Sequence, residues 1–441
     1  MSAVRVTPSL FKAYDIRGVV DTALTPDAVR LIGSALGSEA AALGESAICV
    51  GRDGRLSGPM LRDALVAGIT STGTDVIDVG MVPTPVLYFS TVHLGTGSGV
   101  EITGSHNPPE YNGLKMMMAG TTLHGDAIQA LRSRIESGNL VRAGTPGEER
   151  MADVLPAYLE RIRTTVKLAR PMKIAIDCGN GVAGPTAVTL FRTLGCDVVE
   201  LFTDIDGTFP NHHPDPAHPE NLEDLIRALR DTDAELGLAF DGDGDRLGVV
   251  TKDGQIIYPD RQIMLFAQDI LAAYPGGEII FDVKCTRRLA PWIREHGGRP
   301  TMWRTGHSLI KAKLKDSGAP FAGEMSGHLF FNDRWPGFDD GLYAGARLLE
   351  ILSRSADPSA VLNALPSAVS TPELHLHTAE GENFALVERL RNQAKFEGAE
   401  QIITIDGVRA EWSDVFGLAR PSNTTPVVVL RFEGDTPEAL A

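Results

Sequence analysis

A threefold internal repeat is the feature that most restricts what this chain can fold into. In each copy an apolar strand ends in an acidic residue and is followed by a polar turn, an amphipathic helix, a glycine and a second strand. The strand pairs are expected at 47–53 and 76–79, at 174–177 and 198–201, and at 279–282 and 301–303. The helices between them are expected at 59–70, 185–194 and 289–296. Strands that alternate with helices predict three similar α/β units with mixed sheets, each of about a hundred residues.

The chain has 441 residues, which is too long for one hydrophobic core. Breaks rich in Gly, Pro or charge occur at 144–149, 252–254 and 355–359. After residue 371 the pattern changes to strand candidates around one helix, which predicts a smaller α+β domain. The expected strands and helix of this domain are 374–376, 401–405, 427–432 and 384–394. The expected domains are 1–149, 150–254, 255–366 and 367–441.

The run Asp241-Gly242-Asp243-Gly244-Asp245-Arg246 joins two apolar segments, 236–240 and 247–250. Three carboxylates at alternate positions repel one another unless a cation lies between them. Magnesium is favoured, because short aspartate side chains leave room for water and a phosphate oxygen. A calcium-binding EF-hand would need Gly and Glu where this chain has Arg246 and Lys252. A solvated acidic turn is the remaining alternative.

A serine lies in the stiff loop Thr103-Gly104-Ser105-His106-Asn107-Pro108-Pro109, which follows the apolar segment 99–102. The two prolines fix the backbone, so we expect Ser105 to be displayed with an exposed hydroxyl. The loop lacks the G-x-S-x-G pattern of a hydrolase, which argues against acyl transfer despite His106. A serine that only caps a turn is the alternative. A phosphorylated serine beside a divalent metal would be an electrophile, so the serine and aspartate loops complement each other.

Two further loops combine groups that suit a phosphosugar. Arg420-Pro421-Ser422-Asn423-Thr424-Thr425-Pro426 offers a guanidinium, hydroxyls and an amide for a phosphate that is held but not cleaved. In Gly323-Glu324-Met325-Ser326-Gly327-His328 a carboxylate and a hydroxyl two residues apart suit vicinal sugar hydroxyls. A generic polar turn and a hairpin turn are the respective alternatives. Lys284 and His307 follow strands, where open α/β sheets bind ligands, although His307 could equally be structural.

The composition excludes several classes of partner. The formal charge of −16 and the pI of about 5.2 argue against nucleic acid and anionic membranes. The four cysteines show no metal-binding spacing and are expected to be reduced thiols. The start of the chain lacks an apolar leader, and no stretch reaches the roughly eighteen apolar residues of a membrane span. We therefore expect a cytoplasmic protein.

Along the chain the four loops come in the order serine loop, aspartate loop, Glu324 loop and Arg420 loop. In this order they resemble those of the α-D-phosphohexomutases, most closely the bacterial phosphomannomutase/phosphoglucomutase branch. The opening Phe11-Lys12-Ala13-Tyr14-Asp15-Ile16-Arg17-Gly18 also resembles the signature of the family's first domain. The resemblance covers essentially the whole chain. It implies four domains around a central cleft, each contributing one loop.

The resemblance also implies an isomerase, an intramolecular phosphotransferase that interconverts hexose 1-phosphate and hexose 6-phosphate of mannose, glucose or both. Ser105 would rest as phosphoserine, and a hexose 1,6-bisphosphate would be both the bound intermediate and the activator. Mg²⁺ would be held by Ser105, Asp241, Asp243 and Asp245. The implied catalytic residues are Ser105, His328, Lys115, Arg17 and Arg246, with His328 as the best candidate for the base that deprotonates the sugar. The implied substrate-binding residues are Tyr14, Lys284, His307, Glu324, Ser326, Arg420, Ser422, Asn423 and Thr424.

This sequence departs from the family at two places. Thr425 stands where many relatives have Glu, and the chain ends at Ala441, soon after Thr436-Pro437-Glu438 sets up a helix start, whereas relatives continue into a closing helix. We therefore expect a fourth domain that is trimmed or differently packed, and less stable than the others.

Other functions remain as alternatives. The main alternative is a phosphoglucosamine mutase. A metal-dependent sugar phosphatase is a weaker alternative, because it would not need a second phosphate-binding site at Arg420. A non-catalytic phosphosugar sensor would have lost Ser105 or an aspartate, and none is lost. The expected partner is a small phosphosugar bound by a monomer, with no nucleic acid and no membrane.

Overall fold

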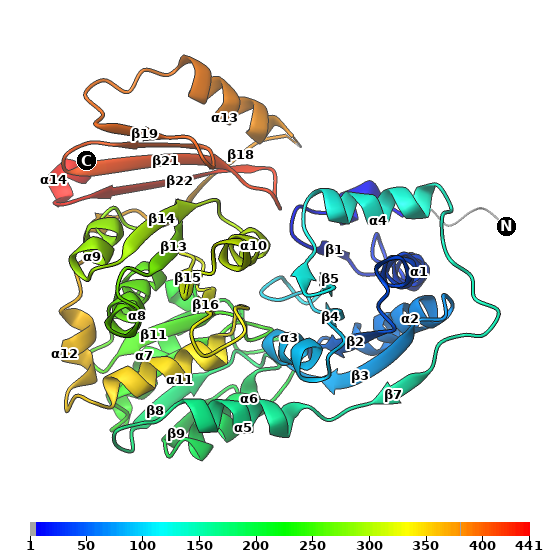
Figure 1. The fold of residues 1–441 in the computed structure, drawn as a ribbon. Helices are drawn as coiled ribbons and strands as arrows, with labels where there is room; N and C mark the ends of the chain where they lie inside the picture. The colour runs from blue at the N-terminus through cyan, green and yellow to red at the C-terminus, as the bar shows by residue number, and fades with distance from the viewer. Residues whose placement is uncertain (1–5, 380) are drawn as a thin grey trace. The chain divides into compact units, whose positions relative to one another are not determined.

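The computed structural model describes residues 6–379 and 381–441. The first five residues, on which the absence of a leader was argued, lie outside the described residues. The chain forms two compact units (Figure 1). One comprises the chain up to Tyr258 together with Ser326–Asn363, and the other comprises Pro259–Met325 and Ala364–Ala441.

The first unit begins with a mixed sheet in the order β1-β5-β4-β2-β3-β7, with β6 added beside β5. Its core strands β4, β2, β3 and β7 run parallel, whereas β1, β5 and β6 pair in antiparallel fashion. The strands are β1 (Ile16–Val19), β2 (Ala47–Arg52), β3 (Asp75–Met81), β4 (Gly99–Ile102), β5 (Tyr111–Met118), β6 (Thr121–Thr122) and β7 (Glu149–Met151).

Helices bury their apolar faces against this sheet. They are η1 (Pro8–Leu10), α1 (Pro26–Leu43), α2 (Gly58–Thr70), α3 (Thr84–His93) and α4 (Asp126–Glu136). Helix α1 shows how the sequence sets its limits: Thr25 caps the N-terminus by accepting from the Ala28 N–H at 3.2 Å, and Gly44 ends the helix in the left-handed conformation. The core lies between α1, α2 and the strands, where Ile32, Leu65 and Val50 are fully buried.

A second mixed sheet of the first unit has the order β12-β11-β10-β8-β9. Strands β8, β9 and β10 are parallel, and β10 turns back into the antiparallel β11 through residues 241–246. The strands are β8 (Lys173–Asp177), β9 (Asp197–Leu201), β10 (Leu236–Phe240), β11 (Leu247–Thr251) and β12 (Ile256–Ile257). The remaining elements of this unit are α5 (Leu155–Thr165), α6 (Gly184–Thr193), η2 (Pro219–Leu222), α7 (Glu223–Asp231), β16 (Leu329–Phe331), α11 (Gly341–Leu352) and α12 (Pro358–Asn363).

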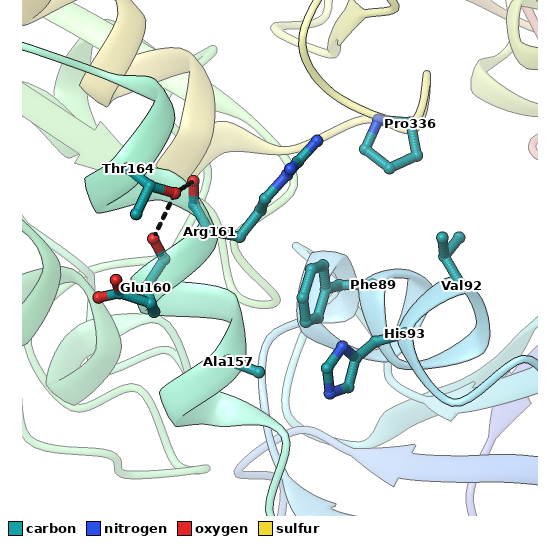
Figure 2. A pocket seen from close by; sticks show the side chains of 8 residues that line it. All are labelled: Phe89, Val92, His93, Ala157, Glu160, Arg161, Thr164 and Pro336. Atoms are coloured by element: carbon teal, nitrogen blue, oxygen red, sulfur yellow. Dashed lines mark hydrogen bonds between the residues drawn. The ribbon is translucent and has the colours of Figure 1, made fainter.

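An aromatic cluster joins α3, α5 and the segment that precedes α11. The Phe89 ring lies parallel to that of Trp335, with centroids 5.9 Å apart, and edge-on to Tyr158 at 5.5 Å. The Tyr158 hydroxyl donates to the Asp340 carboxylate, 3.0 Å from either oxygen, while Asp340 caps α11. Figure 2 shows an apolar pocket beside this cluster. It is lined by Phe89, Val92, His93, Ala157, Glu160, Arg161, Thr164 and Pro336.

The buried Asp340 makes stability depend on pH. Burial raises the pKa of its carboxyl to about 7, with the neighbouring Asp339 charge adding to the effect. Because the folded state binds this proton more tightly than the unfolded chain, the stabilisation is present at low pH and is lost as pH rises from about 4 through 7. Between pH 5 and pH 8 the unfolding free energy of the wild-type protein should fall because of this group. In Asp340→Asn, which cannot ionise there, we expect that fall to be smaller by about 2 kcal/mol. Urea unfolding of both proteins at the two pH values measures this, and parallel pH profiles would contradict it.

The second unit has a parallel sheet in which β13 (Glu278–Asp282) lies between β14 (Arg299–Trp303) and β15 (Phe321–Gly323). Its helices are α8 (Pro259–Ala273), α9 (Leu289–Glu295) and α10 (His307–Ser317). An antiparallel sheet follows in the order β17-β22-β21-β20-β19, with β18 also paired to β22. Its elements are β17 (Val369–Ser370), β18 (Leu374–His377), α13 (Glu382–Gln393), β19 (Gln401–Ile403), β20 (Val408–Glu411), β21 (Val415–Pro421), β22 (Val427–Gly434) and α14 (Pro437–Leu440).

The predicted fold class, three α/β parts and a smaller α+β part, is confirmed. The sequence pattern did not predict β20 and β21. Arg420, which was expected in the loop ahead of β22, lies within β21. The predicted helix start near the end of the chain is correct, since Thr436 caps α14 by accepting from the Ala439 N–H. Within the described part of the chain, no helix combines the length and apolar character that a bilayer span requires.

Candidate active site

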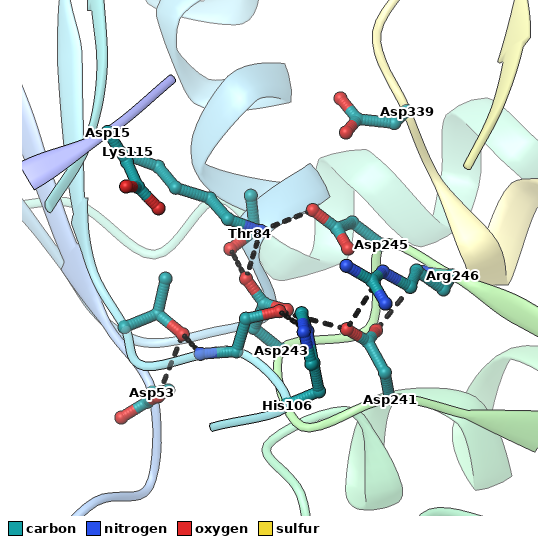
Figure 3. Close-up of polar contacts among 12 residues, drawn as sticks. Asp15, Asp53, Thr84, His106, Lys115, Asp241, Asp243, Asp245, Arg246 and Asp339 are labelled. Carbon is teal, nitrogen blue, oxygen red and sulfur yellow. Dashed lines mark hydrogen bonds and ion pairs between the residues drawn. The ribbon is translucent and has the colours of Figure 1, made fainter. Parts of the chain in front are cut away.

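The turn between β10 and β11 brings three carboxylates together. Asp241, Asp243 and Asp245 are fully buried, and each offers an oxygen within 4.8 Å of the others (Figure 3). The glycines between them are required by geometry. A Cβ on Gly242 would lie 2.3 Å from the Ser105 carbonyl oxygen, and Gly244 has a φ of 77°, which favours glycine.

Ser105 meets this cluster directly. Its hydroxyl donates to Asp241 Oδ2 at 3.0 Å and lies 3.2 Å from His106 Nδ1. Its backbone is left-handed, with a φ of 49°, which is uncommon outside glycine and stores strain that the surrounding loop must hold. The expected exposed hydroxyl is wrong: Ser105 is only 1% exposed, with the backbone of the aspartate loop packed against its carbonyl. The sequence could not predict this burial, because the covering backbone at Gly242 belongs to a different sheet.

Lys115 is a buried counterion of two of the three aspartates. Its ammonium donates to Asp243 Oδ2 at 2.6 Å and to Asp245 Oδ2 at 2.5 Å, and the lysine is only 3% exposed. Burial alone would lower the pKa of Lys115, but the two carboxylates outweigh it and raise that pKa above its usual range. Burial likewise opposes ionisation of Asp243, yet the Lys115 ammonium holds the pKa of Asp243 below its usual range. For Asp241, burial and the neighbouring carboxylates raise the pKa well above that of a free aspartate.

Arg246 and His328 also lie close to the aspartates. Arg246 Nε donates to His328 Nε2 at 3.1 Å, and the backbone N–H of Arg246 donates to Asp241 Oδ1 at 3.1 Å. His328 Nδ1 lies 3.0 Å from Asp339 Oδ2 and 3.6 Å from Asp245 Oδ1. Asp339 is fully buried and is a site residue that the sequence analysis did not identify.

Arg17 supports the serine loop from β1. Its guanidinium pairs with Asp15 at 2.6 Å, donates to the Asn107 side chain, and lies 3.4 Å from the Gly104 carbonyl. These contacts place Arg17 beside the loop that carries Ser105. Tyr14, three residues before Arg17, lies in the bend that precedes β1.

Arg55, which the sequence analysis missed, fastens the serine loop. This buried guanidinium donates to four backbone carbonyls and to the Asp53 carboxylate. The carbonyls belong to Ser105 at 2.8 Å, Asn107 at 2.6 Å, Pro108 at 2.6 Å and Tyr111 at 2.9 Å. Asp53 also accepts from the Thr103 hydroxyl at 2.8 Å and the Gly104 N–H at 3.2 Å. Arg55 and Asp53 together thus hold the strained turn at Ser105 in place.

We expect Arg55→Lys to weaken this loop, because an ammonium keeps the charge but lacks the planar set of donors that four carbonyls require. The unfolding free energy should fall by about 2–4 kcal/mol and kcat should fall about tenfold or more. Thermal melts and steady-state kinetics measure the two effects. Arg227→Lys is the matched control, since Arg227 forms an exposed ion pair with Asp224 and should tolerate the change. Equal behaviour of the two variants would contradict a role for Arg55.

Thr84 was also missed. Its hydroxyl donates to Asp243 Oδ2 at 2.6 Å, and its N–H bonds to the Asp243 carbonyl at 3.0 Å. Thr84 is the first residue of α3 and follows Pro83, so the sequence carried only the ordinary signal of a helix start.

The donor set fits a divalent cation. Asp243 Oδ1 and Asp245 Oδ1 are buried and, within the described part of the chain, have no hydrogen-bond partner. Such oxygens are the ligands that a hard cation prefers. The aspartate cluster could therefore hold a metal ion, with the Ser105 oxygen next to it.

Most of the expected substrate residues belong to the second unit. Glu324 Oε1 accepts from the Gly306 N–H at 2.5 Å, which ties the Glu324 loop to the turn before His307 at the start of α10. Asp282 accepts from the Met325 N–H at 3.1 Å and from the Thr305 hydroxyl at 2.8 Å. Ser326, half-buried, falls in the first unit.

The loop that follows Arg420 connects to the same turn. Asp406 Oδ2 accepts from Arg420 Nε at 3.1 Å and from the Thr305 N–H at 2.9 Å. The Ser422 hydroxyl lies 3.3 Å from that of Thr424 and 2.9 Å from that of Thr425, and Asn423 stands between them in the turn.

Lys284 pairs with Glu373 at 2.6 Å. Burial would raise the pKa of Glu373, but Lys284 outweighs it and lowers that pKa to about 2. The second unit therefore contains two buried cations that pair with carboxylates, Lys284 with Glu373 and Arg420 with Asp406.

Comparison with known proteins agrees with this geometry. Four family models match consecutive parts of the chain: phosphoglucomutase/phosphomannomutase α/β/α domain I at residues 8–142, domain II at 156–254, domain III at 258–369, and the C-terminal domain at 373–441.

Individual relatives match over nearly the whole chain. A phosphoglucomutase of Neisseria meningitidis is 59% identical over 436 residues, which are 99% of this chain and 95% of that protein. A phosphomannomutase/phosphoglucomutase of Pseudomonas aeruginosa is 56% identical over 433 residues, covering 98% and 93%. A crystal structure of a phosphoglucomutase/phosphomannomutase family protein from Burkholderia thailandensis has a TM-score of 0.94 and 61% identity, covering 99% and 95%. The chain therefore belongs to the phosphoglucomutase/phosphomannomutase family of α-D-phosphohexomutases.

Proposed function

We propose that this protein is a phosphohexomutase that interconverts hexose 1-phosphate and hexose 6-phosphate, with mannose, glucose or both as the sugar. One observation supports this most: the Ser105 hydroxyl lies 3.0 Å from a buried carboxylate of a three-aspartate cluster. A phosphoryl group on that oxygen would be stored next to a cation site and sheltered from water, which phosphoryl transfer needs. The names of the relatives, phosphoglucomutase and phosphomannomutase, agree with this activity.

Mg²⁺ is the proposed metal, held by Asp241, Asp243, Asp245 and an oxygen on Ser105. When bound, it supplies positive charge that offsets the charge of the transferring phosphoryl group. Lys115 would turn from the aspartates toward that group, and Arg246 and Arg17 would add charge at its other oxygens.

The transfer needs a base for the sugar hydroxyl. His328 Nε2 carries a lone pair in this structure, since it accepts from Arg246. We propose that Arg246 leaves Nε2 as it turns toward the phosphoryl group. His328 Nε2 then takes the hydroxyl proton while the phosphoryl group passes from Ser105 Oγ to the sugar oxygen. The product of this step is a hexose 1,6-bisphosphate. The reverse step, from the other end of the bisphosphate, returns a phosphoryl group to Ser105 and a proton to the sugar oxygen.

The remaining residues would bind the part of the sugar that does not react. Arg420, Ser422, Asn423 and Thr424 suit its second phosphate, and an arriving phosphate would take Arg420 from Asp406. Glu324 and Ser326 suit the sugar hydroxyls, with Tyr14, Lys284 and His307 as further contacts. A hexose 1,6-bisphosphate would act as activator, because it can phosphorylate Ser105 again when the intermediate escapes.

A coupled assay tests the proposal. Mannose 1-phosphate, glucose 1-phosphate and glucosamine 1-phosphate are each supplied with Mg²⁺ and a trace of glucose 1,6-bisphosphate, and the 6-phosphates are measured. Formation of mannose or glucose 6-phosphate is the expected result. Release of inorganic phosphate without isomer would indicate a phosphatase, and a clear preference for glucosamine 1-phosphate would indicate a phosphoglucosamine mutase.

We also propose that the enzyme acts as a cytoplasmic monomer. All four cysteines are buried free thiols, which suits a reducing compartment. Sedimentation of the purified protein tests the monomer, and a concentration-independent dimer would contradict it.

A further inference from the structure

The two ring nitrogens of His328 have different neighbours. Nε2 lies 3.1 Å from Arg246 Nε, and Nδ1 lies 3.0 Å from Asp339 Oδ2. The histidine is 4% exposed and Asp339 is fully buried, so solvent has little access to either contact. Protein groups and not water therefore determine the hydrogen-bonding environment of both ring nitrogens.

These neighbours fix the tautomer of the ring. A guanidinium carries only donors, so Nε2 must be the acceptor and must lack a proton. In a neutral imidazole the proton is then on Nδ1, on the side of the Asp339 carboxylate. The tautomer that leaves Nε2 able to accept a proton is the one that Asp339 favours.

We infer that Asp339 is a positioning residue that holds the His328 ring in the Nδ1–H tautomer, so that Nε2 stays unprotonated and can accept a proton once Arg246 leaves it. This rests on the proposed function, in which His328 is the base. A carboxylate that orients a histidine base is a general arrangement in catalysis. Here the two residues are eleven positions apart, on either side of β16.

The backbone holds Asp339 firmly enough for this role. Asp339 forms an isolated β-bridge with Phe330, and His328 forms another with Arg246, so both side chains start from paired backbone. The next residue, Asp340, is tied to α11 and to the Tyr158 hydroxyl. A carboxylate fixed in this way can select one ring orientation with little loss of side-chain entropy.

Asp339→Asn is the informative variant, because it keeps the size of the side chain. An amide can donate to Nδ1 as readily as it can accept from it, so in this variant only Arg246 selects the tautomer. The Nε2–H form then becomes accessible whenever Arg246 leaves Nε2. We expect kcat to fall about 10²-fold and KM to change by less than about threefold, since the substrate contacts remain. Asp340→Asn is the matched control: it is equally buried and adjacent, but it contacts Tyr158 and should keep kcat within about twofold.

Two further measurements separate positioning from a loss of structure. Nitrogen NMR of the imidazole, with the His328 signal assigned by His328→Gln, should show the Nδ1–H tautomer in the wild-type protein and a gain of Nε2–H in Asp339→Asn. The double variant His328→Gln, Asp339→Asn should have the kcat of His328→Gln alone within about twofold, because Asp339 acts through the ring.

Each outcome bears on the inference. It is overturned if the wild-type ring is in the Nε2–H tautomer, if the two substitutions add in full, or if Asp339→Asn keeps wild-type kcat while His328→Gln loses it. If His328→Gln keeps wild-type kcat, the role of His328 in the proposed function falls, and the inference falls with it. The wild-type NMR measurement needs no variant, so a folding defect in Asp339→Asn cannot hide the answer.

Discussion

Ser105→Ala is expected to lower kcat for the isomerisation of glucose 1-phosphate by at least about 10⁴-fold. The reason is chemical: without the Ser105 oxygen there is no atom on which the phosphoryl group can be stored between its two transfers. We expect no neighbouring group to replace it, because in the proposed function the Asp241 carboxylate binds the cation. The coupled assay measures this loss directly.

Intact-mass measurement gives a second, independent test. After incubation with glucose 1,6-bisphosphate, the wild-type protein should gain the mass of one phosphoryl group and Ser105→Ala should gain none. Ser90→Ala is the control, because Ser90 is an equally buried serine whose hydroxyl bonds to a carbonyl within α3. It should be phosphorylated like the wild type. A phosphoryl group that remains on Ser105→Ala would move the storage site to another residue.

The sequence predicted the parts of the site that are contiguous in the chain. The alternation of aspartate and glycine at 241–246 and the proline-stiffened loop around Ser105 carry their chemistry in neighbouring residues. The strand pattern also places each of them after an apolar segment, which is where the structure has β10 and β4. Contiguous motifs can be recognised because backbone geometry and side-chain chemistry are encoded together.

The parts that were missed depend on contacts between distant segments. Arg55 reaches the serine loop from 50 residues away, and its sequence context, a polar turn after β2, does not show what it donates to. Burial of Ser105 was mispredicted for the same reason, since the covering backbone at Gly242 belongs to another sheet. Asp339 sits in a segment whose pattern marks only the start of α11. In each case tertiary packing, which a local pattern does not contain, decides the role of the residue.

The strands β20 and β21 were missed because of their composition. In β20 every second residue is charged, at Arg409 and Glu411, and the segment is only four residues long. In β21 Arg420 stands where the alternation of Phe416 and Leu418 calls for an apolar residue. The structure buries both arginines against partners: Arg409 donates to the carbonyls of Val283 and Cys285, and Arg420 bonds to Asp406. A hydrophobicity pattern does not predict a strand whose buried positions hold charged residues, because their partners are distant in the sequence.

The second large effect is expected for Lys115→Met. In the metal-free protein this change removes the ammonium that bonds to Asp243 and Asp245 and leaves three buried carboxylates close together. Removing one partner of a buried ion pair leaves an uncompensated charge, so the unfolding free energy should fall by about 3–5 kcal/mol. Urea unfolding in the presence of a chelator measures the loss.

Magnesium should reverse much of this loss. A cation bound by the three aspartates takes over the role of the ammonium, and in the variant it no longer competes with Lys115 for Asp243 Oδ2 and Asp245 Oδ2. The stabilisation gained on adding Mg²⁺ should therefore be larger in Lys115→Met than in the wild type, and calorimetric titration should show tighter binding of Mg²⁺.

Lys284→Met provides the matched control for the role of Lys115. Lys284 is also a buried lysine, paired with Glu373 in the other unit, so its loss should destabilise the protein as well. The aspartate cluster is untouched in this variant, and Mg²⁺ should stabilise it no more than it stabilises the wild type. If Lys115→Met is as stable as the wild type in chelator, or if Mg²⁺ restores both lysine variants equally, Lys115 is not the internal counterion of the aspartate cluster.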